Sequence, residues 1–167
     1  MTNPVKGSEK LQVTTPTERQ IVMIRVFDAP RSLVFDALTK PDLLKCWYGA
    51  RGWSLVVCEI DLRVGGSWRF VTRRPDGKEV GQVGVYREIE PPERIVHTEA
   101  WEDWNPGELL VTTVLAEQGG KTTFTSTLLF PSQEVRDILI KAGMTSGAAE
   151  EFDKLAEYLA SIARAEP

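Results

Sequence analysis

The 167-residue chain has little of what disulfide, metal and membrane proteins need: two cysteines, one histidine and no long apolar run. Cys46 and Cys58 form no Cys-x-x-Cys motif, so neither a disulfide framework nor a metal site is predicted, and we interpret both as reduced, buried thiols. No run approaches the roughly 20 apolar residues of a membrane span, and residues 1–10 lack the apolar stretch of a signal peptide. We therefore expect a cytoplasmic protein without membrane insertion, metal or cofactor.

A concentration of positive charge is also missing. Lys and Arg total 20 against 24 Asp and Glu, a net charge of -4, and no basic block could follow a phosphate backbone. This argues against nucleic acid and anionic membrane surfaces as partners. The length suits one domain. Residues 1–17 are polar and lack apolar periodicity, which predicts a flexible tail before a single domain over residues 18–165.

The rest of the chain divides into segments with helical and with strand periodicity. Residues 21–27 are a β-branched run that predicts a strand. Two short helices are predicted over 30–39 and 41–47, each with a proline at its start. Gly- and Pro-rich turns then separate six further predicted strands, near 54–61, 67–74, 80–90, 94–102, 108–117 and 121–130. Residues 148–162 return to a period near 3.6, which predicts a long helix with one apolar face.

This order of elements predicts an α+β fold. Short connections between consecutive strands make the sheet antiparallel. A curved sheet of seven strands must cover its apolar face, and the long C-terminal helix is the element available to pack across it. The two short helices follow the first strand.

Four segments carry a resemblance to a known family. They are RVFDAPRSLVFDALTKPDLLKCWYG (25–49), CEIDLRVGGSWRF (58–70), GVYREIEPPERIVHTEAW (84–101) and FPSQEVRDILIKAGMTSGAAEEFDKLAEYL (130–159). Together they resemble the activator of heat-shock-protein-90 ATPase homologue family, within the START-like or SRPBCC superfamily of birch-pollen-allergen-like proteins. Trp47-Tyr48-Gly49 departs from the family's usual Trp-Trp-Gly. The resemblance implies a helix-grip fold, in which the curved sheet wraps around the long helix.

A strongly curved sheet need not close onto the helix that it grips, and the space between them can hold a small apolar molecule. Strand alternation predicts that Trp68 and Phe70 point inward, and likewise Phe124, Ser126 and Leu128 in the last strand. The predicted pocket residues are Trp47, Trp68, Phe70, Tyr86, His97, Trp101, Phe124, Met144 and Phe152. We expect them to bind an apolar or aromatic small molecule, whose identity the sequence does not specify.

The stretch VHTEAWEDW holds the single histidine among three carboxylates. One face of this strand carries His97, Glu99 and Trp101, and alternation alone does not decide whether that face points inward. If it does, His97 and Glu99 could perform acid–base chemistry. The alternative, which we favour, is that Trp101 packs and His97 makes one hydrogen bond at a half-buried site. Glu99, Glu102 and Asp103 would then form a solvated strand end, and we assign no catalytic residue.

Two glycines, Gly143 and Gly147, interrupt helical sequence, each at a cost of about 1 kcal/mol relative to alanine. They predict a break between a short helix over 132–142 and the long helix. One hypothesis is that the break lies at the cavity mouth and that Met144 is an adaptable cap that opens for ligand. The alternative is a plain helix start, capped by a neighbouring Ser or Thr hydroxyl.

Three functions remain. The first, and the one we favour, is binding of a small apolar molecule without turnover. The second is an enzyme that uses His97 and Glu99, since START-like relatives include cyclases and hydrolases. The third, implied only by the family resemblance, is a co-chaperone that stimulates a heat-shock-protein-90 ATPase. We disfavour a chaperone partner because a short tail stands where the eukaryotic activators carry a separate binding domain. An exposed edge strand could pair two copies, but no residue requires a homodimer.

Overall fold

The computed structural model describes residues 10–165. Their elements follow in the order β1 (Gln12–Thr14), β2 (Gln20–Phe27), α1 (Arg31–Thr39), α2 (Pro41–Trp47), β3 (Ser54–Ile60), β4 (Ser67–Arg73), β5 (Glu79–Glu90), β6 (Arg94–Trp101), β7 (Leu109–Gln118), β8 (Lys121–Leu129), α3 (Gln133–Lys141) and α4 (Met144–Ala165). The strands form one antiparallel sheet in the order β1-β2-β8-β7-β6-β5-β4-β3. The predicted α+β class is therefore observed.

The sheet has eight strands among the described residues, not the seven that the sequence predicted. The additional strand, β1, pairs with β2, where Val13 lies opposite Met23. It belongs to residues 1–17, so the prediction of a flexible tail was wrong for this part, and residues 1–9 lie outside the described residues. Three residues are too few to show an alternating pattern, so periodicity could not predict β1. The strand forms its hydrogen bonds with the edge of β2.

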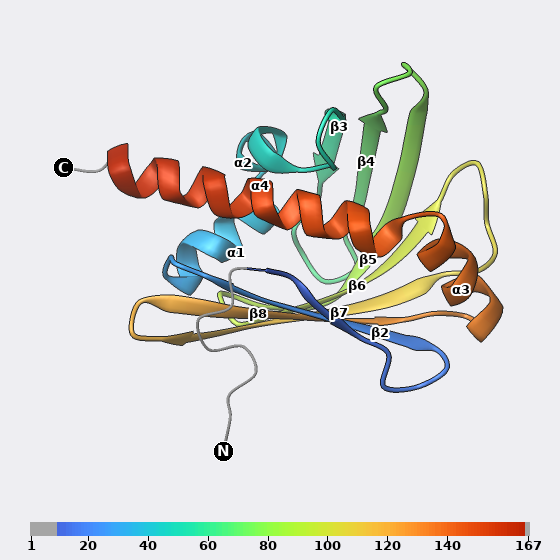
Figure 1. Cartoon of the computed structure of the whole chain (residues 1–167), viewed down its shortest axis with the longest axis horizontal. Helices are drawn as coiled ribbons and strands as arrows, with labels where there is room; N and C mark the ends of the chain where they lie inside the picture. Colours follow the sequence, from blue (N-terminus) through green and yellow to red (C-terminus); the bar gives the residue numbers. More distant parts are fainter. Residues whose placement is uncertain (1–9, 166–167) are drawn as a thin grey trace.

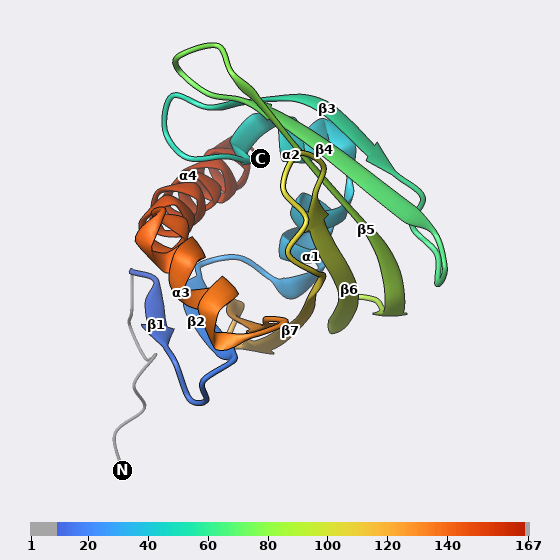
Figure 2. The same ribbon diagram turned by 90° about the vertical axis from the view of Figure 1, so that its right-hand side faces the viewer.

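The sheet is strongly curved, and α4 crosses its concave side (Figure 1). Figure 2 looks nearly along α4 and shows the sheet bending around this helix. Phe152, Leu155 and Leu159 of α4 are buried, and their spacing of three and four residues places them on one stripe. This is the helix-grip arrangement expected from the sequence. None of the described helices combines the length and the apolar character that a membrane span requires.

Strand β8 shows how alternation sets the two faces of the sheet. Phe124, Ser126 and Leu128 are buried, whereas the alternating Thr123, Thr125 and Thr127 are only half-buried. The register places Ser126 opposite Met23, so the buried faces of β8 and β2 coincide. Trp68 and Phe70 of β4 are buried as well. The predicted inward faces of these strands are therefore correct, and these faces form the concave side of the sheet.

The two short helices are joined through the indole of Trp47, whose Nε1 donates a hydrogen bond to the carbonyl oxygen of Ala37 at 3.0 Å. Cys46, one residue earlier, is turned by about 100° around the helix axis and is exposed. Cys58 of β3 is half-buried. The interpretation of both cysteines as buried thiols was therefore wrong for Cys46.

The predicted break between the two C-terminal helices is confirmed. Ser132 caps α3, because its Oγ accepts a hydrogen bond from the amide N–H of Val135 at 3.2 Å. Gly143 has a φ of +97°, a left-handed conformation that glycine adopts without strain. Since α4 begins at Met144, the chain changes direction at this one residue.

Candidate ligand-binding site

A cavity of about 450 Å³ lies between the concave side of the sheet and α4. Its volume is within the range of about 300–1,000 Å³ that small-molecule sites occupy. All nine residues predicted to form the pocket lie on its wall: Trp47, Trp68, Phe70, Tyr86, His97, Trp101, Phe124, Met144 and Phe152. That these residues bind a ligand stays a prediction.

One part of the wall, the apolar wall, consists of Met23 of β2, Val111 of β7, Phe124 and Leu128 of β8, and Phe152 of α4. All five side chains are buried. The rings of Phe124 and Phe152 pack with centroids 4.8 Å apart, and Phe27 lies behind them, 6.1 Å from Phe124. Such contacts between rings fix the shape of this side of the cavity.

A second part, the polar wall, consists of Tyr48 after α2, Gln82 of β5, Glu99 of β6 and Glu151 of α4. Gln82 Nε2 donates to Glu99 Oε2 at 3.3 Å, and the Tyr48 hydroxyl donates to Gln82 Oε1 at 3.4 Å. The amide N–H of Gly49 donates to Glu151 Oε2 at 3.1 Å. Both contacts of Gln82 are long for hydrogen bonds, so these groups can exchange them for contacts with a ligand.

The carboxyl groups of the polar wall are poorly solvated. Burial raises the pKa of Glu99 from 4.5 to about 7. Burial also raises the pKa of Glu151 to about 7; the charge of Glu99 adds to this rise, whereas the Gly49 amide and the Lys154 ammonium oppose it. Burial and then the charges of both glutamates hold the pKa of Tyr48 well above its usual range. The polar wall therefore changes from neutral to anionic near neutral pH.

His97 faces the cavity, which settles the orientation that alternation left open. Its Nδ1 lies 3.0 Å from the carbonyl oxygen of Thr98, which can only accept, so Nδ1 carries the proton. Trp68 and Tyr86 approach the imidazole edge-on, with centroids 5.4 and 6.2 Å away. Burial lowers the pKa of His97, although the hydrogen bond to Thr98 opposes this. His97 is therefore a neutral part of the wall, and it makes the one hydrogen bond that was expected of it.

Glu99 is not part of a solvated strand end, and the expectation on this residue was wrong. It shares the cavity face of β6 with His97 and Trp101. Glu102 and Asp103, which follow the strand, are exposed as expected, and Glu102 pairs with a surface arginine, Arg69, at 3.0 Å. The strand ends at Trp101, so alternation continues through Glu99 and turns its carboxyl inward.

The indole N–H of Trp68 is a second unusual polar group on the wall. Trp68 is 5% exposed, and its Nε1 has no hydrogen-bond partner among the described residues. The ring lies over Gly84 of β5, where an added Cβ atom would come within 2.4 Å of Nε1. A buried donor without an acceptor costs about 1–3 kcal/mol, so the packing of this ring against Gly84 lowers stability.

The cavity reaches the surface beside the junction of α3 and α4. Ala142 lines the cavity and is exposed, and Gly143, Met144 and Gly147 line it and are half-buried. Met144 is therefore at the mouth, where the hypothesis of a movable cap places it. That it opens for ligand stays a prediction.

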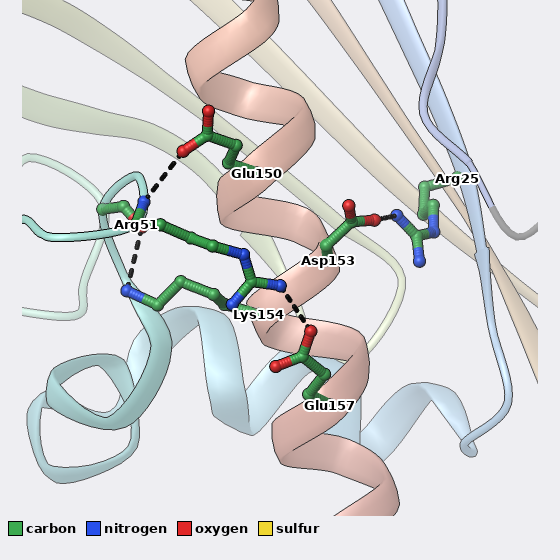
Figure 3. A network of polar contacts seen from close by, with 7 residues as sticks. Arg25, Arg51, Glu150, Asp153, Lys154 and Glu157 are labelled. Atoms are coloured by element: carbon green, nitrogen blue, oxygen red, sulfur yellow. Dashed lines mark hydrogen bonds and ion pairs between the residues drawn. The ribbon is translucent and has the colours of Figure 1, made fainter.

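Polar contacts hold α4 on two of its sides (Figure 3). Asp153 Oδ1 pairs with Nη1 of Arg25 on β2 at 2.6 Å, and Arg25 is 5% exposed. Because this guanidinium is buried, the pair connects α4 firmly to the sheet: loss of the carboxylate would leave the charge uncompensated.

The loop after α2 holds α4 from another direction (Figure 3). Arg51 contacts the helix twice, since its amide N–H donates to Glu150 at 3.0 Å and its guanidinium pairs with Glu157. Lys154 Nζ donates to the carbonyl oxygen of Gly49 at 3.1 Å. These contacts hold the middle of α4 over the cavity, which Glu151 of this helix lines.

None of the four residues of the polar wall was among the nine predicted pocket residues; Glu99 was considered only in the alternative in which its face of the strand points inward, and Gln82 and Glu151 were not considered. Glu151 lies three residues after Ala148 and four before Leu155, so helical spacing already placed it on the face that packs against the sheet. Gln82 shares the face of Tyr86 by strand alternation. Both positions could thus be placed on inward faces. Neither residue was assigned to the pocket, because polar residues are usually solvated and the pocket was predicted from apolar residues.

The eight-stranded curved sheet, the helix that it grips and the cavity between them define a protein of the START-like, helix-grip class. Residues 28–160 match the family described as "Activator of Hsp90 ATPase homolog 1-like protein". The chain belongs to this family, as the sequence resemblance indicated.

Solved structures are similar over most of the chain. A protein from Rhodobacter sphaeroides is 30% identical with a TM-score of 0.85, and the match covers 91% of this chain and 99% of that chain. A protein from Nitrosomonas europaea is 24% identical with a TM-score of 0.81, covering 90% and 99%. A Mycobacterium smegmatis protein, at 20% identity and a TM-score of 0.77, covers 89% and 97% and shares the fold. No curated protein sequence matches the chain significantly.

Proposed function

We propose that the protein binds one small, largely apolar molecule in the cavity and releases it unchanged. The observation that carries this proposal is the cavity itself, about 450 Å³ with walls that are mostly aliphatic and aromatic. Protein interiors are close-packed, and unfilled space lowers stability. A core that served stability alone would fill this space with larger side chains, so the space supports a binding role.

Native mass spectrometry of the purified protein tests the proposal. We expect a stoichiometric additional mass that is released on denaturation and can then be identified. A protein isolated without ligand should instead take up Nile red, a neutral apolar dye whose emission rises on burial. Absence of both the additional mass and the dye binding would contradict a small-molecule function.

A matched pair of variants locates the binding. Ala148 lines the cavity from α4, whereas Ala160 of the same helix is exposed. Ala148→Phe places a ring in the cavity and should abolish binding, while Ala160→Phe should leave it unchanged. If both variants bind as the parent protein does, the ligand occupies another place.

An enzyme is a second candidate, favoured by the pKa of about 7 at Glu99 on the cavity wall. A carboxyl with such a pKa can both donate and accept a proton at neutral pH. The released molecule distinguishes the two functions. It should be recovered unchanged after incubation with the protein; a new product that forms with the parent protein and not with Glu99→Gln would favour the enzyme.

A further inference from the structure

The charges on the cavity wall are of one sign. Glu99 and Glu151 line the cavity, and no Lys or Arg is among its wall residues, all of which belong to the described part of the chain. His97 contributes no positive charge at neutral pH because burial lowers its pKa. When its carboxyl groups ionise, the cavity therefore carries uncompensated negative charge.

Neither carboxylate has an ion-pair partner within the described residues 10–165. Lys154, which acts on Glu151 electrostatically, directs its Nζ to the carbonyl oxygen of Gly49. Tyr48, on which both carboxylates act electrostatically, is neutral because burial raises its pKa. Buried carboxylates normally have a cationic partner or several hydrogen bonds. Here the partner is missing on the cavity side.

Aromatic rings line the same cavity as these carboxyls. Tyr48 and Phe70 pack with centroids 5.1 Å apart, and Phe70 and Trp68 with centroids 4.9 Å apart. Ring faces attract cations, most strongly where water is excluded.

We infer that the ligand is an apolar or aromatic amine whose ammonium group binds between Glu99 and Glu151 while its apolar body contacts the apolar wall. This inference rests on the proposed small-molecule function and narrows it. It excludes fatty acids and other organic anions, because their carboxylate would be buried beside like charge with no basic group to receive it.

Three probes of similar shape test the inference: naphthylmethylamine, naphthylmethanol and naphthoate, titrated calorimetrically into the full-length protein. At about pH 8 we expect the amine to bind about tenfold more tightly than the alcohol, since a charge-assisted hydrogen bond is about twice as strong as a neutral one. Naphthoate should bind most weakly. Protonation of the two carboxyls at about pH 5.5 should weaken amine binding roughly tenfold and leave the alcohol unchanged, because alkylamines stay protonated throughout.

Isosteric variants connect this preference to the two residues. Glu99→Gln and Glu151→Gln keep an acceptor but remove the charge, so each should abolish most of the preference for the amine and keep alcohol binding. Glu150→Gln is the matched control: Glu150 is exposed, precedes Glu151 on α4 and contacts Arg51 outside the cavity. It should retain the preference for the amine.

The outcomes separate this inference from the proposed function. Equal binding of amine and alcohol, or an amine preference that persists in both Gln variants, overturns the inference and leaves a neutral apolar site. Failure of all three probes to bind overturns the inference, and the small-molecule function fails with it when the additional mass and Nile red binding are also absent.

Discussion

The apolar wall and the polar wall border the same cavity but have opposite effects on folding. On the apolar wall, Phe124 and Phe152 are buried against each other and stabilise the fold. On the polar wall, Glu99 and Glu151 have raised pKa values, so their ionisation works against folding. Residues that lower stability are commonly found where function requires them. Under the proposed function, the apolar wall serves the fold and the polar wall serves recognition.

The largest effect is expected on the apolar wall. Phe124→Ala removes a ring that packs against Phe27 and Phe152, and we expect the free energy of unfolding to fall by about 3 kcal/mol. Urea denaturation measures this change. Thr125→Ala, on the other face of β8, should change stability by less than about 0.5 kcal/mol. Equal losses of stability in both variants would contradict the assignment of Phe124 to the buried face of β8 and of Thr125 to its other face.

The polar wall should make stability depend on pH. Glu99 and Glu151 have pKa values of about 7 when folded, against 4.5 for an ordinary glutamate, so between these values the folded state binds more protons than the unfolded state. The free energy of unfolding should therefore fall as pH rises from about 4.5 to about 7. Partial solvation of the cavity reduces the effect, which we expect to be about 2 kcal/mol in total.

Urea denaturation across this pH range, compared with the double variant Glu99→Gln/Glu151→Gln, isolates the contribution of the polar wall. The pKa of His97 is lowered by burial, so His97 acts in the opposite direction, but it is common to both proteins and cancels in the difference. The double variant should lose less stability over this window. Parallel pH profiles for the two proteins would show that the carboxyls are not perturbed by folding.

The smallest effects are expected at the mouth, where Gly143 and Gly147 have different surroundings. An added Cβ at Gly147 meets no atom within 4 Å, so Gly147→Ala should raise stability by about 0.5–1 kcal/mol through helix propensity. Gly143→Ala should lower it by about 1 kcal/mol, because φ is +97° there. Thermal denaturation measures both changes in stability. We also expect slower ligand exchange in Gly147→Ala, which stopped-flow mixing measures. An unchanged exchange rate would argue against the movable cap.

Much of the fold could be predicted from the sequence because most strands alternate clearly and the turns contain Gly or Pro. The bounds of β3 to β8 agree with prediction to within one residue. Strand β1 could not be predicted in this way, since its three residues are fixed by the edge of β2 and not by their own pattern. Local periodicity therefore reveals elements that bury one face, and it misses those that only complete a sheet.

In the candidate site, too, some residues could be predicted from the sequence and others could not. Aromatic residues such as Trp68 and Phe124 were assigned to the cavity because apolar side chains at alternating positions face inward. Glu99 and Glu151 were not, because a carboxylate in a sequence is normally solvated, and only the curvature of the sheet reveals that theirs face a cavity. The shape of the pocket was thus predictable, whereas its charge was not.

Four of the five tryptophans line the cavity: Trp47, Trp53, Trp68 and Trp101. The fifth, Trp104, is 40% exposed and lies 5.9 Å from Trp101 between ring centroids. The molecule therefore carries its own optical reporter. In a Trp104→Phe protein, all tryptophan emission would originate at the cavity wall, so unlabelled protein excited selectively at tryptophan could screen a chemical library by quenching or spectral shift alone.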